Sequence, residues 1–262
     1  MLEQINLSLK LPKKDYKRQL PDLQRRLYDL EKTCWDEKIP SIVIFSGWDA
    51  AGKGSAIATL TERLDPRGFK LHKTQAPRTY EQQRPWLWRF WLNIPSYGEM
   101  AIFDLSWYQR VLVERVEKLV PKRAWRRAYR DIVDFERMLA DDGAVIVKLW
   151  MHISKKEQKK RFQALEKDPL ESWRVAKQDW ERHAKYDDYR QAAEEMFERT
   201  DSEWGPWTIV ESTDRWYARR KIFQTLIQTF EERLGDKAPR RYTAEERRGG
   251  EKVVDISKEG GR

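Results

Sequence analysis

The stretch that decides the fold spans Ser41 to Ser55 and reads Ser-Ile-Val-Ile-Phe-Ser-Gly-Trp-Asp-Ala-Ala-Gly-Lys-Gly-Ser. It opens with a short apolar, β-branched run, which predicts a buried strand that ends near Gly47. Its second half matches the G-x-x-x-x-G-K pattern of a phosphate-binding (Walker A) loop, and a helical pattern follows it. A chance pair of glycines is the alternative, but the strand before the loop and the helix after it favour a phosphate-binding loop.

The residue types of this loop suit phosphate. Glycines let the backbone turn so that successive N–H groups point at phosphate oxygens. A helix that begins at the same place adds the positive end of its dipole, and Lys53 adds a point charge. Gly54 stands where such loops normally carry a Ser or Thr that holds magnesium, and Ser55 comes one position late. Asp49, inside the loop, is therefore the better candidate for a metal ligand.

Composition limits the class of protein. The chain has 262 residues, of which 40% are hydrophobic, so it can form a sizeable core. A run of ~18 apolar residues and a signal-peptide pattern are both lacking, so we expect no membrane span. Cys34 is the only cysteine, which fits the reducing cytoplasm. The net charge of +9 suits a polyanion such as nucleic acid, an anionic membrane or polymeric phosphate.

Apolar runs and helical patterns alternate along the chain. The strands expected are 41–45, 69–73, 100–104, 144–150 and 207–210, and the helices are 15–37, 53–64, 80–92, 107–119, 124–139, 155–166 and 215–234. A break is expected at Pro21, inside the first helical pattern. The alternation predicts an α/β fold whose parallel sheet is flanked by helices. We expect a single domain over residues 1–235, followed by a disordered basic tail over 236–262.

A second carboxylate follows another predicted strand. Asp104 comes directly after the apolar run 100–103. Taken alone, Asp104 fits a helix N-cap or a turn equally well. A phosphate-binding loop uses a metal ion that bridges phosphate oxygens, and its usual second acidic partner ends a neighbouring strand. Together with the loop at Gly47, a metal role for Asp104 is the better hypothesis.

Beyond the loop, an ordered series of motifs resembles the polyphosphate kinase 2 family. Residues 103–108 read Phe-Asp-Leu-Ser-Trp-Tyr, similar to that family's F-D-R-S-W-Y, and residues 47–54 resemble its G-x-D-x-x-G-K-G. Further matches are Ala76-Pro77 with Glu81, 87–91, Phe135-Glu136 with Leu139, 147–150, Arg161-Phe162, 168–170 with Trp173-Arg174, and Pro206-Trp207. The resemblance covers residues 14–234, and an ordered set of this kind is far more specific than a loop alone.

The resemblance implies a fold and a reaction. The fold implied is that of P-loop NTPases, similar to thymidylate kinases, with a helical lid that we place at residues 160–200. The reaction implied is phosphoryl transfer between inorganic polyphosphate and an adenine nucleotide (AMP, ADP or ATP) with Mg²⁺. The chain looks most similar to polyphosphate:AMP phosphotransferases, which make ADP; transfer at the ADP/ATP level is the alternative. Homo-oligomers, dimers or tetramers, are also implied.

The resemblance also implies roles for individual residues. Asp49 and Asp104 would hold the metal, and Lys53 would hold phosphates with the loop amides. The catalytic set implied is Asp49, Lys53, Asp104 and Arg161, and the binding set is Gly47, Ala50, Ala51, Gly52, Gly54, Ser55, Arg110 and Arg174. Arg161 and Arg174 are expected to meet phosphate when the lid closes, which would also exclude water.

Two positions depart from the family pattern. Leu105 stands where the family carries Arg, so a bidentate phosphate contact is lost, and Arg110 is a partial replacement one turn later. The protein is then slower, altered in its donor, or a degenerate module that binds polyphosphate or nucleotide without turnover. Arg78 replaces a small hydroxyl residue and faces either the site or water. Nucleic-acid binding lacks a helix-turn-helix, zinc or RNA-recognition signature, so we expect none.

Aromatic and histidine residues carry weaker signals. Trp86, Trp88 and Trp91 lie in one predicted helix, and their spacing favours core packing over stacking on a nucleobase. The three histidines show no spacing typical of metal ligands, so no role is assigned to His72, His152 or His183.

Overall fold

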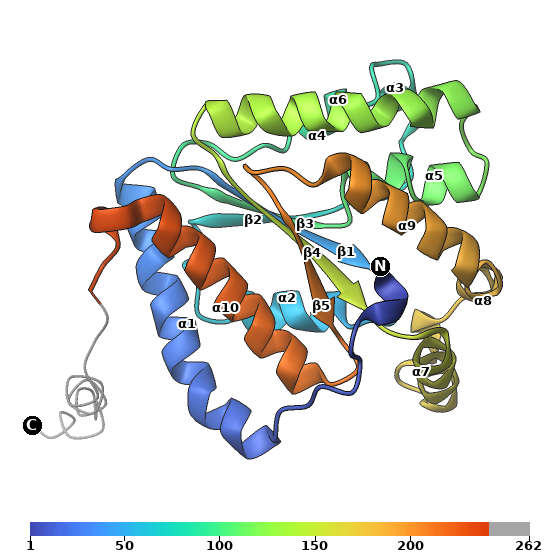
Figure 1. Ribbon diagram of the computed structural model, residues 1–262, viewed down its shortest axis with the longest axis horizontal. Helices are drawn as coiled ribbons and strands as arrows, with labels where there is room; N and C mark the ends of the chain where they lie inside the picture. Colours follow the sequence, from blue (N-terminus) through green and yellow to red (C-terminus); the bar gives the residue numbers. More distant parts are fainter. Residues whose placement is uncertain (241–262) are drawn as a thin grey trace, which may run out of the picture.

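A computed structural model describes residues 1–240 and shows a five-stranded parallel sheet between two layers of helices (Figure 1). The strands are β1 (Ser41–Gly47), β2 (Phe69–Lys73), β3 (Met100–Asp104), β4 (Val145–His152) and β5 (Trp207–Glu211). Their order across the sheet is β2-β3-β1-β4-β5, and every neighbouring pair is parallel. The predicted α/β class and all five predicted strands are confirmed.

Helices cover both faces of the sheet. The longer ones are α1 (Lys13–Asp36), α2 (Lys53–Thr61), α6 (Lys122–Asp141), α7 (Lys155–Lys167), α8 (Lys177–Ala184), α9 (Tyr186–Thr200) and α10 (Arg215–Leu234). The short ones are α3 (Thr79–Gln82), α4 (Trp88–Trp91), α5 (Val113–Val116) and the 3-10 turns η1 (Leu2–Gln4), η2 (Trp107–Arg110), η3 (Ser172–Arg174) and η4 (Gly235–Lys237). In Figure 1, α1, α10 and α2 lie on one side of the sheet, and α6 and α9 on the other.

The apolar runs of the sequence explain the central strands. Every residue of β4 is buried, and in β1 every residue but the last is buried, because helices cover both faces of the sheet. β1 lies between β3 and β4, with Phe45 opposite Asp104 and Gly47 opposite Met151. The carboxyl ends of these strands therefore meet at the same edge of the sheet, where the phosphate-binding loop begins.

The expected break at Pro21 is wrong. Pro21 lies inside a continuous helix, α1. An interior proline removes one hydrogen bond and costs about 3 kcal/mol. The helix persists because Tyr16, Leu27 and Leu30 are buried and α1 packs along α10, so tertiary contacts outweigh the local cost.

Two other predicted helices are shorter than expected. The segment 80–92 forms α3 and α4 with Pro85 between them, since a proline and the residue before it disfavour helix. The helical spacing of its tryptophans consequently fails to define one buried face. Trp86 packs against the core, Phe90 is buried, and Trp91 remains 38% exposed beside Phe135. The segment 107–119 forms only η2 and α5.

Residues 160–200 contain two kinds of structure. The end of α7, η3 and α8 carry many exposed side chains, with Leu170 and Trp173 at 82% and 80% exposure. In contrast, α9 buries Ala193, Met196 and Phe197 in the main core. The predicted basic tail falls mostly on residues 241–262, which lie outside the described residues. Within residues 1–240, no helix is long and apolar enough to cross a membrane.

Candidate active site

The loop after β1 has the backbone that phosphate binding requires. Gly47 has φ of 125° and Gly52, which precedes α2, has φ of 98°. A Cβ on Gly47 would lie 2.3 Å from the carbonyl oxygen and 2.6 Å from the nitrogen of Met151, so only glycine fits beside β4. A Cβ on Gly54 would meet nothing within 4 Å. Gly54 is therefore not demanded by the protein's own packing.

Lys53 lies across the loop. Its Nζ donates to the carbonyl oxygens of Gly47 and Trp48 at 3.1 and 2.9 Å. The ammonium is thus held over the backbone that would surround a phosphate group. The contact of Lys53 with phosphate, which the sequence motif predicts, stays a prediction.

Trp48 anchors the loop to the core. Its indole stacks on Tyr186 at the start of α9, with ring centroids 3.9 Å apart, and its Nε1 donates to Nδ1 of His152 at 2.9 Å. The bond requires a neutral imidazole, and burial lowers the pKa of His152 to about 4. No role was assigned to His152 from its spacing, but in the structure it anchors the loop through Trp48.

Asp104 ends β3 beside the loop, as the sequence predicts. β3 pairs with β1, which brings Asp104 opposite Phe45, two residues before Gly47. The Asp104 carboxylate forms no hydrogen bond or ion pair within the described chain. Next to it, Leu105 has φ of 62°, in the left-handed region that a branched side chain rarely adopts. The turn is held by Leu105 itself, whose N–H donates to Phe45 and whose carbonyl accepts from Thr74 Oγ1 at 2.6 Å.

Asp49 is contacted from α7 and α8. Arg182 Nη1 lies 3.7 Å from Asp49 Oδ2, and Gln158 Nε2 donates to the Asp49 carbonyl oxygen at 3.1 Å. Gln158 Oε1 is 2.7 Å from Nδ1 of His183, so α7 and α8 meet at the loop. No role was assigned to Arg182 or to Gln158 from the sequence. Neither belongs to a recognisable motif, so pattern alone could not identify them.

Arg161 forms hydrogen bonds only to the protein itself in this conformation. Its Nε donates to Glu157 Oε1 at 2.9 Å, and Nη1 donates to the Ala50 carbonyl at 2.9 Å. Its Nη2 donates to the carbonyls of Ser212 and Thr213 at 2.7 and 3.0 Å. Arg161 therefore ties α7 to the loop and to the junction of β5 and α10. The predicted phosphate contact of Arg161 stays a prediction.

The other two predicted arginines lie in different surroundings. Arg110 forms an ion pair with Glu114 at 2.7 Å and stacks over Trp86. Burial lowers the pKa of Arg110, and its Nε has no hydrogen-bond partner among the described residues. Arg174, in η3, is half exposed and pairs with Glu171. Neither of these two residues contacts the loop.

A buried polar network fixes the segment after Asp104. Lys148, on β4, is fully buried and donates to Glu136 Oε2 at 2.9 Å and to the Thr200 carbonyl at 2.7 Å. Trp107 Nε1 and the Tyr108 hydroxyl both donate to Glu136 Oε1, at 2.9 and 2.7 Å. Burial, followed by the charge of Glu136, raises the pKa of Tyr108 well above its usual value. The network ties η2 to α6 and β4.

Asp49 and Asp104 suit a magnesium ion. Mg²⁺ is usually bound through one or two carboxylates, several waters and substrate phosphates rather than by an all-protein cage. Among residues 1–240, no group of three or more His, Cys, Asp or Glu side chains could hold a metal. The Asp104 carboxylate is unengaged, and Asp49 has only the 3.7 Å contact with Arg182. These two residues fit a metal that is completed by phosphate oxygens.

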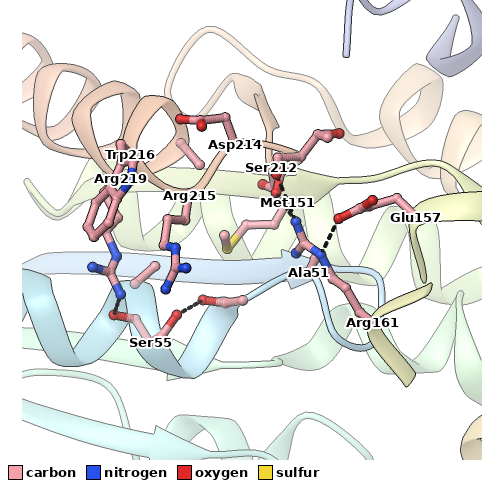
Figure 2. Close-up of a pocket in the computed structure, with 14 residues that line it drawn as sticks. Ala51, Ser55, Met151, Glu157, Arg161, Ser212, Asp214, Arg215, Trp216 and Arg219 are labelled. Carbon is pink, nitrogen blue, oxygen red and sulfur yellow. Dashed lines mark hydrogen bonds and ion pairs between the residues drawn. The ribbon is translucent and has the colours of Figure 1, made fainter. Parts of the chain in front are cut away.

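A cavity of about 500 Å³ opens beside the second half of the loop (Figure 2). Figure 2 shows Arg161 on one side of it and Arg215, Trp216 and Arg219 on the other. Its walls come from the start of α2, from α7 and from residues 212–219 at the junction of β5 and α10. Asp49 and Asp104 do not line this cavity. The two carboxylates therefore lie outside the lining of this cavity.

A family model for polyphosphate kinase 2 (PPK2) matches residues 10–238. The chain belongs to the polyphosphate kinase 2 family. Its P-loop kinase-like fold is also that of solved PPK2 structures. The structure of a putative polyphosphate kinase 2 from Pseudomonas aeruginosa PA01 has a TM-score of 0.86 and 40% identity, over 89% of this chain and 50% of that one. Polyphosphate kinase 2 from Arthrobacter aurescens TC1 has a TM-score of 0.86 and 31% identity, over 95% and 91%.

Curated PPK2 relatives include proteins named for AMP. The polyphosphate:AMP phosphotransferase of Pseudomonas syringae is 42% identical over 234 residues, which are 88% of this chain and 46% of the relative. The AMP/ADP-polyphosphate phosphotransferase of Meiothermus ruber is 35% identical over 226 residues, 86% of this chain and 84% of the relative. The chain therefore spans about half the length of the Pseudomonas syringae relative and most of the length of the Meiothermus ruber relative.

Proposed function

We propose that this PPK2 chain transfers a phosphoryl group from inorganic polyphosphate to AMP, giving ADP. The observation that carries the proposal is the pairing of β3 with β1, which brings Asp104 beside a phosphate-binding loop that holds Lys53 and Asp49. Relatives named polyphosphate:AMP phosphotransferases, at 40–42% identity, support AMP as the acceptor. Phosphoryl transfer asks a protein chiefly to align two anions and to stabilise charge, which is what such a site offers.

Each residue has a part in this proposal. Loop amides and Lys53 hold the phosphates of the donor, and Asp49 and Asp104 hold Mg²⁺. The metal, when bound, offsets negative charge on the transferred group. An oxygen of the AMP phosphate forms a bond to the terminal phosphorus of polyphosphate, and the phosphoanhydride bond behind it breaks. The shortened polyphosphate leaves with the bonding electrons, and α7 and α8 limit access of water to the site.

The lid in this proposal is narrower than residues 160–200. The end of α7, η3 and α8 form the part that moves, because α9 is packed in the core and Trp48 stacks on Tyr186 at its start. Arg174 lies on this segment, and closure would bring it toward the donor.

We also place the protein in the cytoplasm as a homo-oligomer. Cys34 is the only cysteine of the sequence, which agrees with a reducing compartment.

The test uses purified protein, magnesium and polyphosphate, with AMP and ADP in separate reactions and the nucleotides resolved by chromatography. We expect ADP to form from AMP, and Asp49→Asn to abolish it. Turnover of ADP alone would reject AMP as the acceptor. The AMP/ADP name of the Meiothermus ruber relative, whose length the chain covers to 84%, favours this second activity as the alternative.

A chain that binds polyphosphate without turnover is the other alternative, and Leu105 motivates it. Leu105→Arg would then raise the activity strongly, because the family carries Arg at this position. With an active wild-type protein, the same substitution is expected to change the rate by a few-fold only.

A further inference from the structure

The position of the Asp104 carboxylate depends on its backbone. Among the described residues, this carboxylate forms no hydrogen bond or ion pair of its own. The next residue, Leu105, has φ of 62°, a left-handed conformation that is unfavourable for a residue with a Cβ. Such a conformation persists only where the surrounding structure holds it. Neighbouring segments must therefore fix the turn formed by Asp104 and Leu105.

Thr74, the residue after β2, holds this turn from the neighbouring strand. Its backbone N–H donates to the Asp104 carbonyl oxygen at 3.0 Å, and its hydroxyl donates to the Leu105 carbonyl oxygen at 2.6 Å. The first bond continues the pairing of β2 with β3, in which Lys73 lies opposite Asp104, so any residue type could make it. The second bond comes from the side chain and requires a hydroxyl at position 74.

The chain after the turn is fixed by buried side chains. Ser106, Trp107 and Tyr108 are all buried. Trp107 Nε1 and the Tyr108 hydroxyl donate to the same oxygen of Glu136, which is itself 1% exposed. Among residues 1–240, the Thr74 hydroxyl makes the only side-chain hydrogen bond to the backbone of the turn itself. Loss of this hydroxyl would therefore free the turn while the segment after it stays in place.

We propose that Thr74 is a positioning residue, whose hydroxyl sets the direction in which Asp104 presents its carboxylate to the metal. The inference rests on the proposed function for the metal role of Asp104, and it adds what holds that ligand in place. Groups that orient a metal ligand typically contribute roughly 10–100-fold to metal affinity or activity. Without the hydroxyl, Leu105 relaxes toward an ordinary conformation, and the Asp104 carboxylate turns with it.

The first test measures metal binding without nucleotide. Mn²⁺, which favours the same oxygen ligands as Mg²⁺, is mixed with tripolyphosphate, and binding of this complex to the full chain is followed by water proton relaxation. Thr74→Val keeps the shape of the side chain and loses the hydroxyl, so we expect the affinity to fall roughly tenfold. Thr74→Ser keeps the hydroxyl and should bind as the wild type does.

Thr229→Val is the matched control for this test. Thr229, in α10, also donates its hydroxyl to a backbone carbonyl oxygen, that of Thr225, at 2.9 Å. It is half-buried, as Thr74 is. The control loses the same kind of hydrogen bond away from the turn, and its affinity for the complex should equal that of the wild type.

A double-mutant cycle separates positioning from a general loss of structure. If Thr74 acts through Asp104, Thr74→Val should cause no further loss of metal affinity in the Asp104→Asn background. Binding remains measurable in that background, because Lys53, Asp49 and the loop amides still hold the complex under the proposed function. Equal losses in both backgrounds would overturn the proposal, and so would wild-type affinity in Thr74→Val.

The second test measures kinetics with AMP. In Thr74→Val, kcat should fall roughly tenfold and the magnesium concentration for half-maximal rate should rise, while KM for AMP stays constant. Thr74 also lines a cavity of about 310 Å³ together with Arg78 and Arg89. A higher KM for AMP with unchanged magnesium dependence would overturn the proposal and indicate that Thr74 contacts the acceptor. Thr74→Ala also lacks the hydroxyl, and it keeps both tests valid where Thr74→Val does not fold.

The two proposals can fail separately. A wild-type protein that binds the Mn²⁺–tripolyphosphate complex but phosphorylates no nucleotide would reject the proposed function, and the comparison with Thr74→Val would still decide the role of Thr74. Formation of ADP by the wild type, together with equal metal affinity in the wild type and in Thr74→Val, would reject the positioning role alone.

Discussion

The two sides of the phosphate-binding loop differ in the sign of their charge. On the side of β3, Asp104 leaves its carboxylate unengaged, and Asp49 has only a long contact with Arg182. On the side of α10, Arg215 and Arg219 form no ion pair within the described chain. Carboxylates would repel a polyanion unless a metal lies between them, whereas guanidinium groups attract it directly. Under the proposed function, the side of β3 would need a metal ion to bind phosphate, and the side of α10 would not.

The same comparison separates residues that hold the fold from residues held ready for a ligand. Arg161 and Arg215 both line the cavity. Arg161 makes four hydrogen bonds to the protein, while Arg215 only stacks on Trp216. A charged group whose bonds are all internal stabilises structure, and one whose donors are unused can bind a ligand. The predictions below test this division, from the largest effect to the smallest.

The largest effect is expected at Asp104, on the side of the loop next to β3. Asp104→Asn should lower kcat by about a thousandfold, because it removes a metal ligand next to the transferred group. Its free energy of unfolding should change by less than about 0.5 kcal/mol, since the Asp104 carboxylate forms no hydrogen bond or ion pair within residues 1–240. Steady-state kinetics and urea unfolding measure both. Asp134→Asn, an exposed carboxylate of α6, is the matched control and should change neither.

A loss of stability in Asp104→Asn, with the activity retained, would show that Asp104 serves the fold and does not hold a metal. Asp104 would then be a turn or cap residue, which is the alternative that the sequence alone leaves open.

The next effect is a pH dependence of the loop's anchor. Burial lowers the pKa of His152 to about 4, against 6.5 in the unfolded chain. The unfolded state therefore takes up a proton as the pH falls below 6.5, while the folded state does not until about 4. Stability should fall by about 2 kcal/mol between pH 7 and pH 5 from this group, at 1.4 kcal/mol per pH unit. Urea unfolding at several pH values measures the slope.

His152→Gln is the informative variant, because its amide oxygen can still accept from Trp48. The variant should lose this part of the pH slope. Glu31 acts in the opposite sense: burial raises its pKa to about 7, so its contribution falls as the pH rises from 4.5 to 7. A slope that is the same in the wild type and in His152→Gln would show that folding does not lower the pKa of His152.

A smaller effect is expected at Arg161, which tests the structural side of the division. Arg161→Gln should destabilise the protein by about 1–2 kcal/mol, since it loses hydrogen bonds to Ala50, Ser212 and Thr213 that water can partly replace. KM for polyphosphate should change little. Should the stability stay constant while this KM rises strongly, Arg161 contacts phosphate, as the family resemblance implies.

These residues also show which parts of the fold and of the site could be predicted from the sequence. The strand, loop and helix around Gly47, and Asp104 at the end of a second strand, follow from local patterns that the structure repeats. Three-dimensional contacts between distant segments could not be inferred in that way. Lys13 and Trp216 are far apart in the sequence but in contact, and the bonds of Arg161 depend on where α7, the phosphate-binding loop and the junction of β5 and α10 meet. Pro21 was mispredicted for the same reason, because packing on α10 decided the outcome.

The smallest effect is expected at the contact between α8 and the loop. Arg182 lies 3.7 Å from Asp49, and both side chains are partly exposed, so the pair contributes less than about 1 kcal/mol to stability. Arg182→Gln should leave the unfolding midpoint unchanged and raise KM for polyphosphate a few-fold, because α8 then closes less firmly over the loop. Lys177→Gln, an exposed cation of the same helix, is the control. Arg182→Gln could instead lower the magnesium concentration needed for half-maximal rate and leave KM for polyphosphate unchanged. That result would show that Arg182 competes with the metal for Asp49, so that α8 acts on the carboxylates rather than on the donor.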